Sequence, residues 1–440
     1  MALQAQSLLG LLVLPLVAWI LSEHRTRIAP RRLVRIVFAG LGLQVLIAGI
    51  MLNVPASRAA FDWAAGLITA LQEATGSGMR LVFGYLAGGP APFAIVRPES
   101  SFILAFQALP LILIISVLSK LLYHWGLLQP IVRVVGRALE RAFGITGPVG
   151  TSAAANIFLG MVEAPLLIKP YLAAMSRGGL FATMTVGMAG VAGTVLALYA
   201  AMLEPTLPGA TGHLIVASVI SVPAGLMIAE LMVPDPTPAA GGTDGGDIVI
   251  PDPPHSAMDA IAQGTREGVE LLVNVTAMLI VVVALVALAN RVVGFLGAQL
   301  GWTLSIEQMF GWAFAPVAWV LGIPWSECGR AGTLLGTKTV LNELIAYLQL
   351  AQTAAEVLSE RSRLILTYAL CGFANFGSLG IMIGGMAAMV PDRRAEIVSL
   401  GTKTLISGTL ATLMTAAVVG AMTPPGCAPP CAPGAATRAG

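Results

Sequence analysis

The stretch GIPWSECGRAGTLLGTKTVLNELIAYLQL, residues 322–350, is apolar enough to lie in a membrane yet carries Asn342 and Glu343 within it. A second stretch, residues 143–172, reads FGITGPVGTSAAANIFLGMVEAPLLIKPYL and has the same character. Non-helical backbone at membrane depth is tolerated only where protein or a watery cavity satisfies its polar groups. The sequence therefore predicts two re-entrant hairpins, over 143–172 and 306–350, each made of two short helices joined by a polar break.

The composition excludes a soluble protein. Of the 440 residues, 57% are hydrophobic and 10% are charged, whereas soluble proteins have about 25% charged residues. Because this number of charged residues cannot form a water-exposed surface over the whole of a large protein, most of the surface must face lipid. The net charge of +2 is too small and too dispersed to indicate a nucleic-acid partner.

Apolar runs long enough to cross a bilayer recur along the whole chain. A spanning helix needs about 20 such residues, and the sequence predicts an all-α polytopic membrane protein with eight spans. The first run lacks a preceding basic segment and a cleavage site, so it is a retained span. Residues 57–97 are amphipathic and are expected to lie along the membrane interface. The predicted spans are 6–22, 34–53, 101–123, 179–204, 212–233, 268–294, 364–390 and 400–422.

Arginines orient these spans, because cytoplasmic loops of membrane proteins are enriched in basic residues. Basic clusters follow the first and third predicted spans and precede the last one, and the loop 205–211 has none. All the basic loops share the cytoplasmic side of a cell inner membrane if both termini lie outside. Residues 234–256, rich in Pro, Gly and Asp, are expected to form a cytoplasmic linker.

The chain divides into two similar halves that enter the membrane from opposite sides. Residues 101–233 have a span, a hairpin, a span broken near Gly190–Gly193 and a final span. Residues 257–422 repeat this order, with the break near Asn375–Gly377. Broken segments at matching places in inverted halves indicate a transporter with a binding site at the bilayer midplane. Residues 1–100 form a scaffold of spans and interfacial helix, and 423–440 a disordered tail.

Two glutamates, Glu163 and Glu343, are the principal site candidates. An ionised carboxylate at the bilayer centre costs on the order of 2.5 kcal/mol or more, so such residues are usually functional. Each could bind a hydroxylated ligand or exchange a proton, or could only cap its own hairpin. Asn156 and Asn375 lie at the same breaks and could bind a cation or ligand, or cap a turn.

Enzymatic function has little support in the sequence. It contains no Walker loop, no GxSxG, no HExxH and no CxxC pair. The sharpest enzymatic alternative, a membrane protease with two carboxylates, does not require the flanking Asn and Gly breaks.

Cys427 and Cys431 in the tail could form a disulfide or belong to a disordered segment.

Several long motifs resemble the concentrative nucleoside transporter family. They are EAPLLIKPYL (163–172), LFATMTVGMAGVAGTVLALY (180–199), LLGTKTVLNELIAYLQL (334–350), CGFANFGSLGI (371–381) and GTLATLM (408–414). The resemblance implies a homotrimer of eight-span subunits that import nucleosides on an ion gradient. It needs no cofactor beyond the coupling ion, Na⁺ or H⁺.

The resemblance also implies residue roles. Ligand contacts are expected on the first hairpin around Glu163, and in the second half at Glu343 for the ribose. The other implied substrate contacts are Met161, Val162, Val195, Phe373, Asn375 and Ser378. An implied sodium site comprises Asn156, the Leu159 backbone, Gly190 and Val191.

Two departures from the family pattern bear on substrate and ion. Met161 and Val162 stand where a Gln and a hydroxyl residue usually meet the nucleobase, so two hydrogen bonds are lost, each worth roughly 1 kcal/mol. Gly190 replaces the usual serine of the sodium site, which favours proton coupling at least as much as sodium. The alternatives are a transporter of another polar metabolite and a non-transporting receptor or docking protein.

Overall fold

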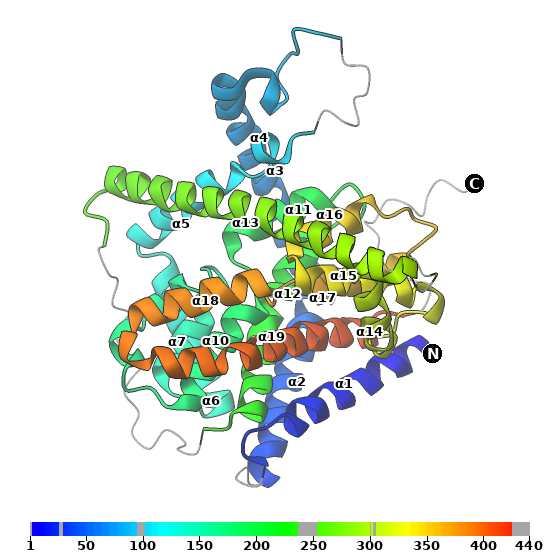
Figure 1. The fold of residues 1–440 in the computed structure, drawn as a ribbon. Helices are drawn as coiled ribbons and strands as arrows, with labels where there is room; N and C mark the ends of the chain where they lie inside the picture. The colour runs from blue at the N-terminus through cyan, green and yellow to red at the C-terminus, as the bar shows by residue number, and fades with distance from the viewer. Residues whose placement is uncertain are drawn as a thin grey trace.

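The computed structural model describes residues 2–25, 30–94, 102–235, 253–299, 301 and 305–424, and every regular element in these ranges is helical (Figure 1). Most of the predicted linker 234–256 and the tail with Cys427 and Cys431 lie outside the described residues. The helices are α1 (Ala2–Ile20), α2 (Pro30–Asn53), α3 (Pro55–Phe83), α4 (Leu104–Gln107), α5 (Leu111–His124), α6 (Leu128–Phe143), α7 (Gly147–Ala155), α8 (Glu163–Leu166), α9 (Lys169–Leu172), α10 (Arg177–Ala189), α11 (Gly193–Leu203), α12 (Ala210–Met232), α13 (Ala257–Gln299), α14 (Ile306–Val320), α15 (Trp325–Val340), α16 (Glu343–Gln352), α17 (Glu360–Leu370), α18 (Phe376–Met389) and α19 (Arg394–Met422), with short 3₁₀ turns at Gly84–Ala87 and Pro391–Arg393.

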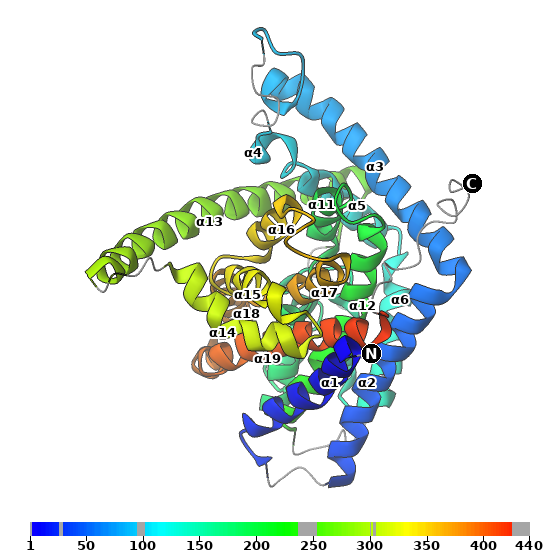
Figure 2. The same ribbon diagram turned by 90° about the vertical axis from the view of Figure 1, so that its right-hand side faces the viewer.

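Six segments in the described part of the chain are long and apolar enough to cross a membrane as continuous helices: Leu3–Ile20, Pro30–Asn53, Leu104–His124, Ala210–Met232, Ala257–Gln299 and Pro391–Met422. The remaining two predicted spans are each divided, into α10 and α11 and into α17 and α18. α3 is not among the six, because its residues are too polar. Figure 2 shows α3 running along one edge of the molecule, where it contacts α2, α5 and α12.

Both breaks occur close to where the sequence places them. α10 ends at Ala189 and α11 begins at Gly193, which confirms the predicted break at Gly190–Gly193. The second break lies slightly earlier than predicted, from Cys371 to Asn375, because Asn375 is already the N-cap of α18. The side chain of a cap residue accepts the first free N–H groups of its helix, so Asn marks a helix start.

Each half contains one pair of closely packed helices joined by a short turn. α6 packs on α7, and α14 packs on α15. Glycines permit the contact, since a Cβ on Gly150 would lie 2.8 Å from the carbonyl oxygen of Gly136 and a Cβ on Gly332 would lie 2.3 Å from that of Gly311. The matching glycine contacts support the internal repeat.

The two predicted hairpin segments each contain helices separated by a break. In 143–172, α7 ends at Ala155 and α8 begins at Glu163, and in 306–350, α15 ends at Val340 and α16 begins at Glu343. α6 precedes the first segment and exposes Arg133, Arg137 and Arg141. Its buried residues recur at Leu128, Val132, Gly136, Leu139 and Phe143, the spacing of one helix face.

The core is built around α12, whose span is 89% buried. It packs against α2, α10 and α19, and α19 lies beside α1, α17 and α18 (Figure 1). α13 is the opposite case, since its apolar span is 6% buried. It packs along α5 and projects from the body in Figure 2. An exposed apolar helix of this kind requires lipid or another protein against it.

Ion pairs gather at one end of the bundle. Glu23, after α1, pairs with Arg177 of α10 at 2.9 Å and with Lys403 of α19. Arg32 at the start of α2 pairs with Glu230 near the end of α12 at 2.8 Å. The arginine-rich loops used to orient the chain therefore lie together, although they are far apart in the sequence.

Candidate functional site

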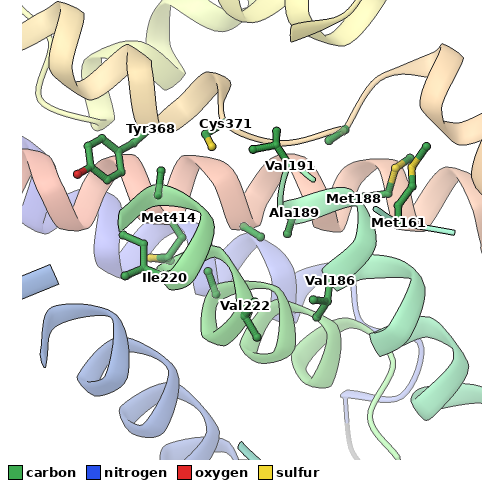
Figure 3. Close-up of a cluster of buried hydrophobic side chains, with 14 of the residues drawn as sticks. Met161, Val186, Met188, Ala189, Val191, Ile220, Val222, Tyr368, Cys371 and Met414 are labelled. Atoms are coloured by element: carbon green, nitrogen blue, oxygen red, sulfur yellow. The ribbon is translucent and has the colours of Figure 1, made fainter. Parts of the chain in front are cut away.

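The two unwound segments cross inside the protein. The backbone N–H of Phe373 donates to the carbonyl of Gly190 at 3.2 Å, and the N–H of Gly193 donates to the carbonyl of Phe158 at 3.3 Å. Figure 3 shows Val191 and Cys371, one from each segment, beside one another. Gly372 is required at this crossing, because a Cβ there would lie 2.8 Å from the Ala189 carbonyl oxygen. The breaks of the two halves thus form one common centre.

Glu343 lies in this region, buried with 5% of its surface exposed. It is the first residue of α16, and Asn342 caps that helix by accepting from the Ile345 N–H at 3.0 Å. Both carboxylate oxygens have a partner: Tyr199 donates its hydroxyl to Oε1 at 2.7 Å, and Asn375 donates its amide to Oε2 at 2.8 Å. A buried carboxylate needs such partners to offset its lost hydration.

Asn375 connects this carboxylate to α18. While its amide nitrogen binds Glu343, its oxygen accepts from the Ser378 N–H at 2.7 Å. Ser378 and Val195 are buried and Phe373 is partly exposed. The structure therefore brings Glu343, Asn375 and Ser378 together, with Phe373 fixed beside them by its bond to Gly190.

Glu163 is in a different environment from Glu343. Its side chain is exposed and folds back on Gly160, where an added Cβ would lie 2.1 Å from its Oε2. Lys120 of α5 and Glu267 of α13 form an ion pair at 2.8 Å. The charges of both residues act on the Glu163 carboxylate. The two glutamates follow equivalent helix pairs but are not equivalent in burial.

Met161 and Val162 pack into the protein. A Cβ on Gly187 of α10 would lie 3.1 Å from Met161 Cβ, and one on Gly385 of α18 would lie 2.7 Å from Val162 Cγ1. Figure 3 shows Met161 beside Met188 of α10. These two side chains hold the loop between α7 and α8 against both neighbouring helices.

The predicted cation residues converge at the first break. Asn156 is buried at the C-terminal end of α7, and its amide nitrogen donates to the Val186 carbonyl at 3.0 Å. Gly190 and Val191 are buried next to it, and Leu159 is half-buried one turn later. A Cβ on Gly190 would lie 3.0 Å from Asn156 Nδ2, so Asn156 and Gly190 are in direct contact.

Two polar residues of this centre, Tyr199 and Lys338, are not among the site residues that the sequence predicts. Tyr199 is the last residue of the apolar motif 180–199, and it binds Glu343. Lys338 is 1% exposed, and its ammonium donates to the Ala369 carbonyl at 2.8 Å and to Thr412 Oγ1 at 2.7 Å. The signal that could have found it is its position one turn before Asn342 and Glu343.

A cavity of about 450 Å³ lies to one side of this centre. It is lined by α3, α5, α11 and α16, of which α11 carries Tyr199 and α16 begins with Glu343. Its polar lining is neutral, from Gln72, Thr75, Gln107 and Gln352 among others.

Three family models match the chain. One described as the C-terminus of Na⁺ dependent nucleoside transporters covers residues 213–420, one described as their N-terminus covers 9–86, and one described as nucleoside recognition covers 105–206. An uncharacterized transporter of Haemophilus influenzae is 38% identical, with 94% of this chain and 96% of that protein covered. The nucleoside permease NupC of Helicobacter pylori is 37% identical, with 94% and 96% covered.

A solved structure agrees with these matches. The structure of CNTnw in an inward-facing, substrate-bound state is similar with a TM-score of 0.84 and 36% identity, covering 96% of this chain and 98% of that one.

Proposed function

The chain belongs to the family of Na⁺-dependent nucleoside transporters, and from this membership we propose that it moves nucleosides across the membrane with the ribose held by Glu343 and Asn375. The predicted family is thereby confirmed, and the chain is a multi-pass membrane protein that carries out nucleoside symport. Members of this family are transporters and not enzymes.

The observation that carries the proposed ribose site is the position of the Glu343 carboxylate. It is buried where the two breaks cross, and its partners Tyr199 and Asn375 come from both halves of the chain. The hydroxyls of a ribose are donors of the kind that a carboxylate accepts. Each hydrogen bond to a charged group is worth about 1.5–3 kcal/mol. Ribose hydroxyls bound here would use the remaining lone pairs of the carboxylate, while Tyr199 and Asn375 keep it in position.

The base is expected next to Phe373 and the loop of Met161 and Val162. Met161 and Val162 offer no donor or acceptor to a base edge, and they are held by packing on Gly187 and Gly385. A site that reads a base by hydrogen bonds rejects wrong bases strongly, while an apolar one discriminates weakly. Purine and pyrimidine nucleosides are therefore both substrates in this proposal.

Sodium is the coupling ion in this proposal, as the family description indicates. The ion would be held at the first break, by Asn156 and by the backbone of Leu159, Gly190 and Val191. Among the described residues no three His, Cys, Asp or Glu side chains form a metal cluster. A site made of neutral oxygens fits an alkali ion, because it carries too little negative charge for a divalent cation.

The membrane arrangement follows from the same elements. Six continuous spans and the two broken ones give eight, with re-entrant hairpins over 143–172, which contains α7, α8 and α9, and over 306–350, which contains α15 and α16, and with α3 at the interface. The ion-paired end with Glu23, Arg177 and Lys403 faces the cytoplasm of the inner membrane, which leaves both termini outside. The exposed apolar α13 packs against a second and third copy in a homotrimer, and alternating access carries the ligand inward.

Calorimetric binding to the purified protein tests the ribose site. Uridine and adenosine should both bind, and uracil alone should bind at least ~10-fold more weakly, since it lacks the hydroxyls that meet Glu343. Glu343→Gln keeps the size of the side chain and should weaken both nucleosides to a similar degree. Glu360→Gln, an exposed carboxylate on α17, is the control. Unchanged nucleoside affinity in Glu343→Gln would refute the assignment of Glu343 to the ribose.

A further inference from the structure

A side chain at position 190 would have little space. Its backbone is extended, with φ −108° and ψ 176°, a conformation open to any residue. The place of its side chain is taken, because a Cβ would lie 3.0 Å from Asn156 Nδ2 and 3.1 Å from the hydroxyl oxygen of Ser221. Ser221 belongs to α12, the buried central helix. A hydroxyl from another helix thus lies next to the position where a serine at residue 190 would place its own.

Ser221 is suited to coordinate a cation. It is 1% exposed, and its hydroxyl donates to the Ser218 carbonyl at 2.7 Å. Because a hydroxyl has one proton and two acceptor lone pairs, this bond uses the proton and leaves the oxygen lone pairs for a cation. The bond also fixes the rotamer, so the oxygen needs no reorganisation on binding.

We propose that Ser221 supplies the hydroxyl ligand of the sodium site, in the place of the side chain that Gly190 lacks. This inference rests on the proposed sodium coupling. The ligand is a small monovalent cation, held by the Ser221 hydroxyl and backbone carbonyls at the first break. The Asn156 amide oxygen joins them when the amide turns, because in this structure its nitrogen faces residue 190 and donates to the Val186 carbonyl. The ion then links three elements: the end of α7, the break after α10 and the core helix α12. Gly190 is consequently no argument for proton coupling, since the oxygen has moved to α12.

Sodium binding to the purified protein without nucleoside tests this directly. The thermal unfolding midpoint is followed as NaCl replaces choline chloride at constant ionic strength, and ²²Na⁺ binding is measured in parallel. Ser221→Ala should raise the Na⁺ concentration for half-maximal effect by about tenfold, the equivalent of 1.4 kcal/mol. Ser407→Ala is the control, because Ser407 is also fully buried but bonds Thr185 on another side of α10. It should lower stability without changing the sodium response.

A double variant that moves the hydroxyl from residue 221 to residue 190 gives a second test. Gly190→Ser alone should be destabilised, because its Cβ meets Asn156 and Ser221. Gly190→Ser combined with Ser221→Ala removes one of these contacts and returns a hydroxyl from residue 190, so sodium affinity should recover to within a few-fold of the original. This double variant also decides the question if Ser221→Ala alone does not fold.

Two results would overturn the inference, and they differ. The first is a sodium response in Ser221→Ala that equals that of Ser407→Ala, or a double variant that folds but does not recover sodium affinity. Either result would show that Ser221 is not a sodium ligand, while sodium coupling itself would stand. An unaltered protein that neither binds ²²Na⁺ nor is stabilised by it would refute the proposed sodium coupling itself.

Discussion

Asn375 donates its side-chain amide to Glu343 across 2.8 Å, although 32 residues separate them in the chain. Asn375 caps α18 and Glu343 opens α16, so the bond joins two helix starts at the centre of the second half. Helix N-termini carry partial positive charge, and both ends therefore favour an anionic group here. The pair places a charged acceptor where the unwound segments of the two halves meet.

Tyr199→Phe should weaken nucleoside uptake without unfolding the protein. The change removes the hydroxyl that binds Glu343 Oε1 at 2.7 Å, and with it a bond to a charged group worth about 1.5–3 kcal/mol, so KM should rise about tenfold or more. The measurement is initial uptake against uridine concentration. Tyr347→Phe, which loses a bond to the Thr367 carbonyl, should lower the unfolding midpoint with a smaller effect on KM. Equal KM values in the two variants would contradict the role given to Tyr199.

Gly160→Ala should displace Glu163. The new Cβ would occupy a point 2.1 Å from Oε2 of Glu163, so the carboxylate must move away from residue 160. We expect a loss of nucleoside affinity of about tenfold or more, with an unfolding midpoint close to the original because Glu163 is exposed. Gly380→Ala on α18 is the control, since its Cβ meets nothing within 4 Å. Normal binding in Gly160→Ala would show that the position of Glu163 is not important for the ligand.

Lys338→Met should destabilise the crossing of the two breaks. Its ammonium joins the Ala369 carbonyl, near the end of α17, to Thr412 of α19, and methionine leaves both without their donor. An unsatisfied buried polar group costs about 1–3 kcal/mol, so the unfolding midpoint in detergent should fall. Lys120→Met, which breaks a partly exposed ion pair with Glu267, should change it much less. A midpoint as high in Lys338→Met as in Lys120→Met would contradict the structural role of Lys338.

Stability should depend on pH through Glu23. Its hydrogen bond from Arg177, helped by Lys403 and opposed by burial, lowers its pKa from 4.5 to about 2. A carboxyl whose pKa is lower in the folded state stabilises the fold above its unfolded pKa, and this stability is lost as pH falls from about 4.5 toward 2. Because the group is near the surface, the contribution is on the order of 1 kcal/mol. Glu23→Gln should unfold at a lower temperature than the original at pH 7, and the two midpoints should approach each other below pH 4.5 and converge near pH 2. Parallel curves for the two proteins would contradict this assignment.

Much of the fold could be predicted from hydropathy and from the residues that interrupt helices. A membrane span needs a long apolar run, and an interruption of a span needs Gly, Pro or Asn. The helix α6 could not. α6 has three arginines on one face and a buried row on the other, and charge counting alone assigns it to a loop. In the second half, where Pro324 and Gly322 mark the turn between α14 and α15, the predicted start at residue 306 agrees with the structure.

The site was only partly predictable. Conspicuous polar residues in apolar runs, such as Glu343 and Asn375, could be identified from one sequence, and the structure brings them together. Tyr199 and Ser221 could not, because a tyrosine or serine in an apolar helix is common and only the crossing of distant segments gives it a partner. For Met161 and Val162 the identity of the residues was informative, but their packing against Gly187 and Gly385 depends on tertiary structure.

We propose that this chain accumulates nucleosides on a sodium gradient and that Glu343 is required for it. The most direct test is uptake of labelled uridine and adenosine into proteoliposomes with an imposed sodium gradient, a proton gradient or none, for the unaltered protein and Glu343→Gln. We expect accumulation of both nucleosides with the sodium gradient alone, and none in Glu343→Gln. Accumulation that is equal with and without the sodium gradient, or that persists in Glu343→Gln, would contradict it.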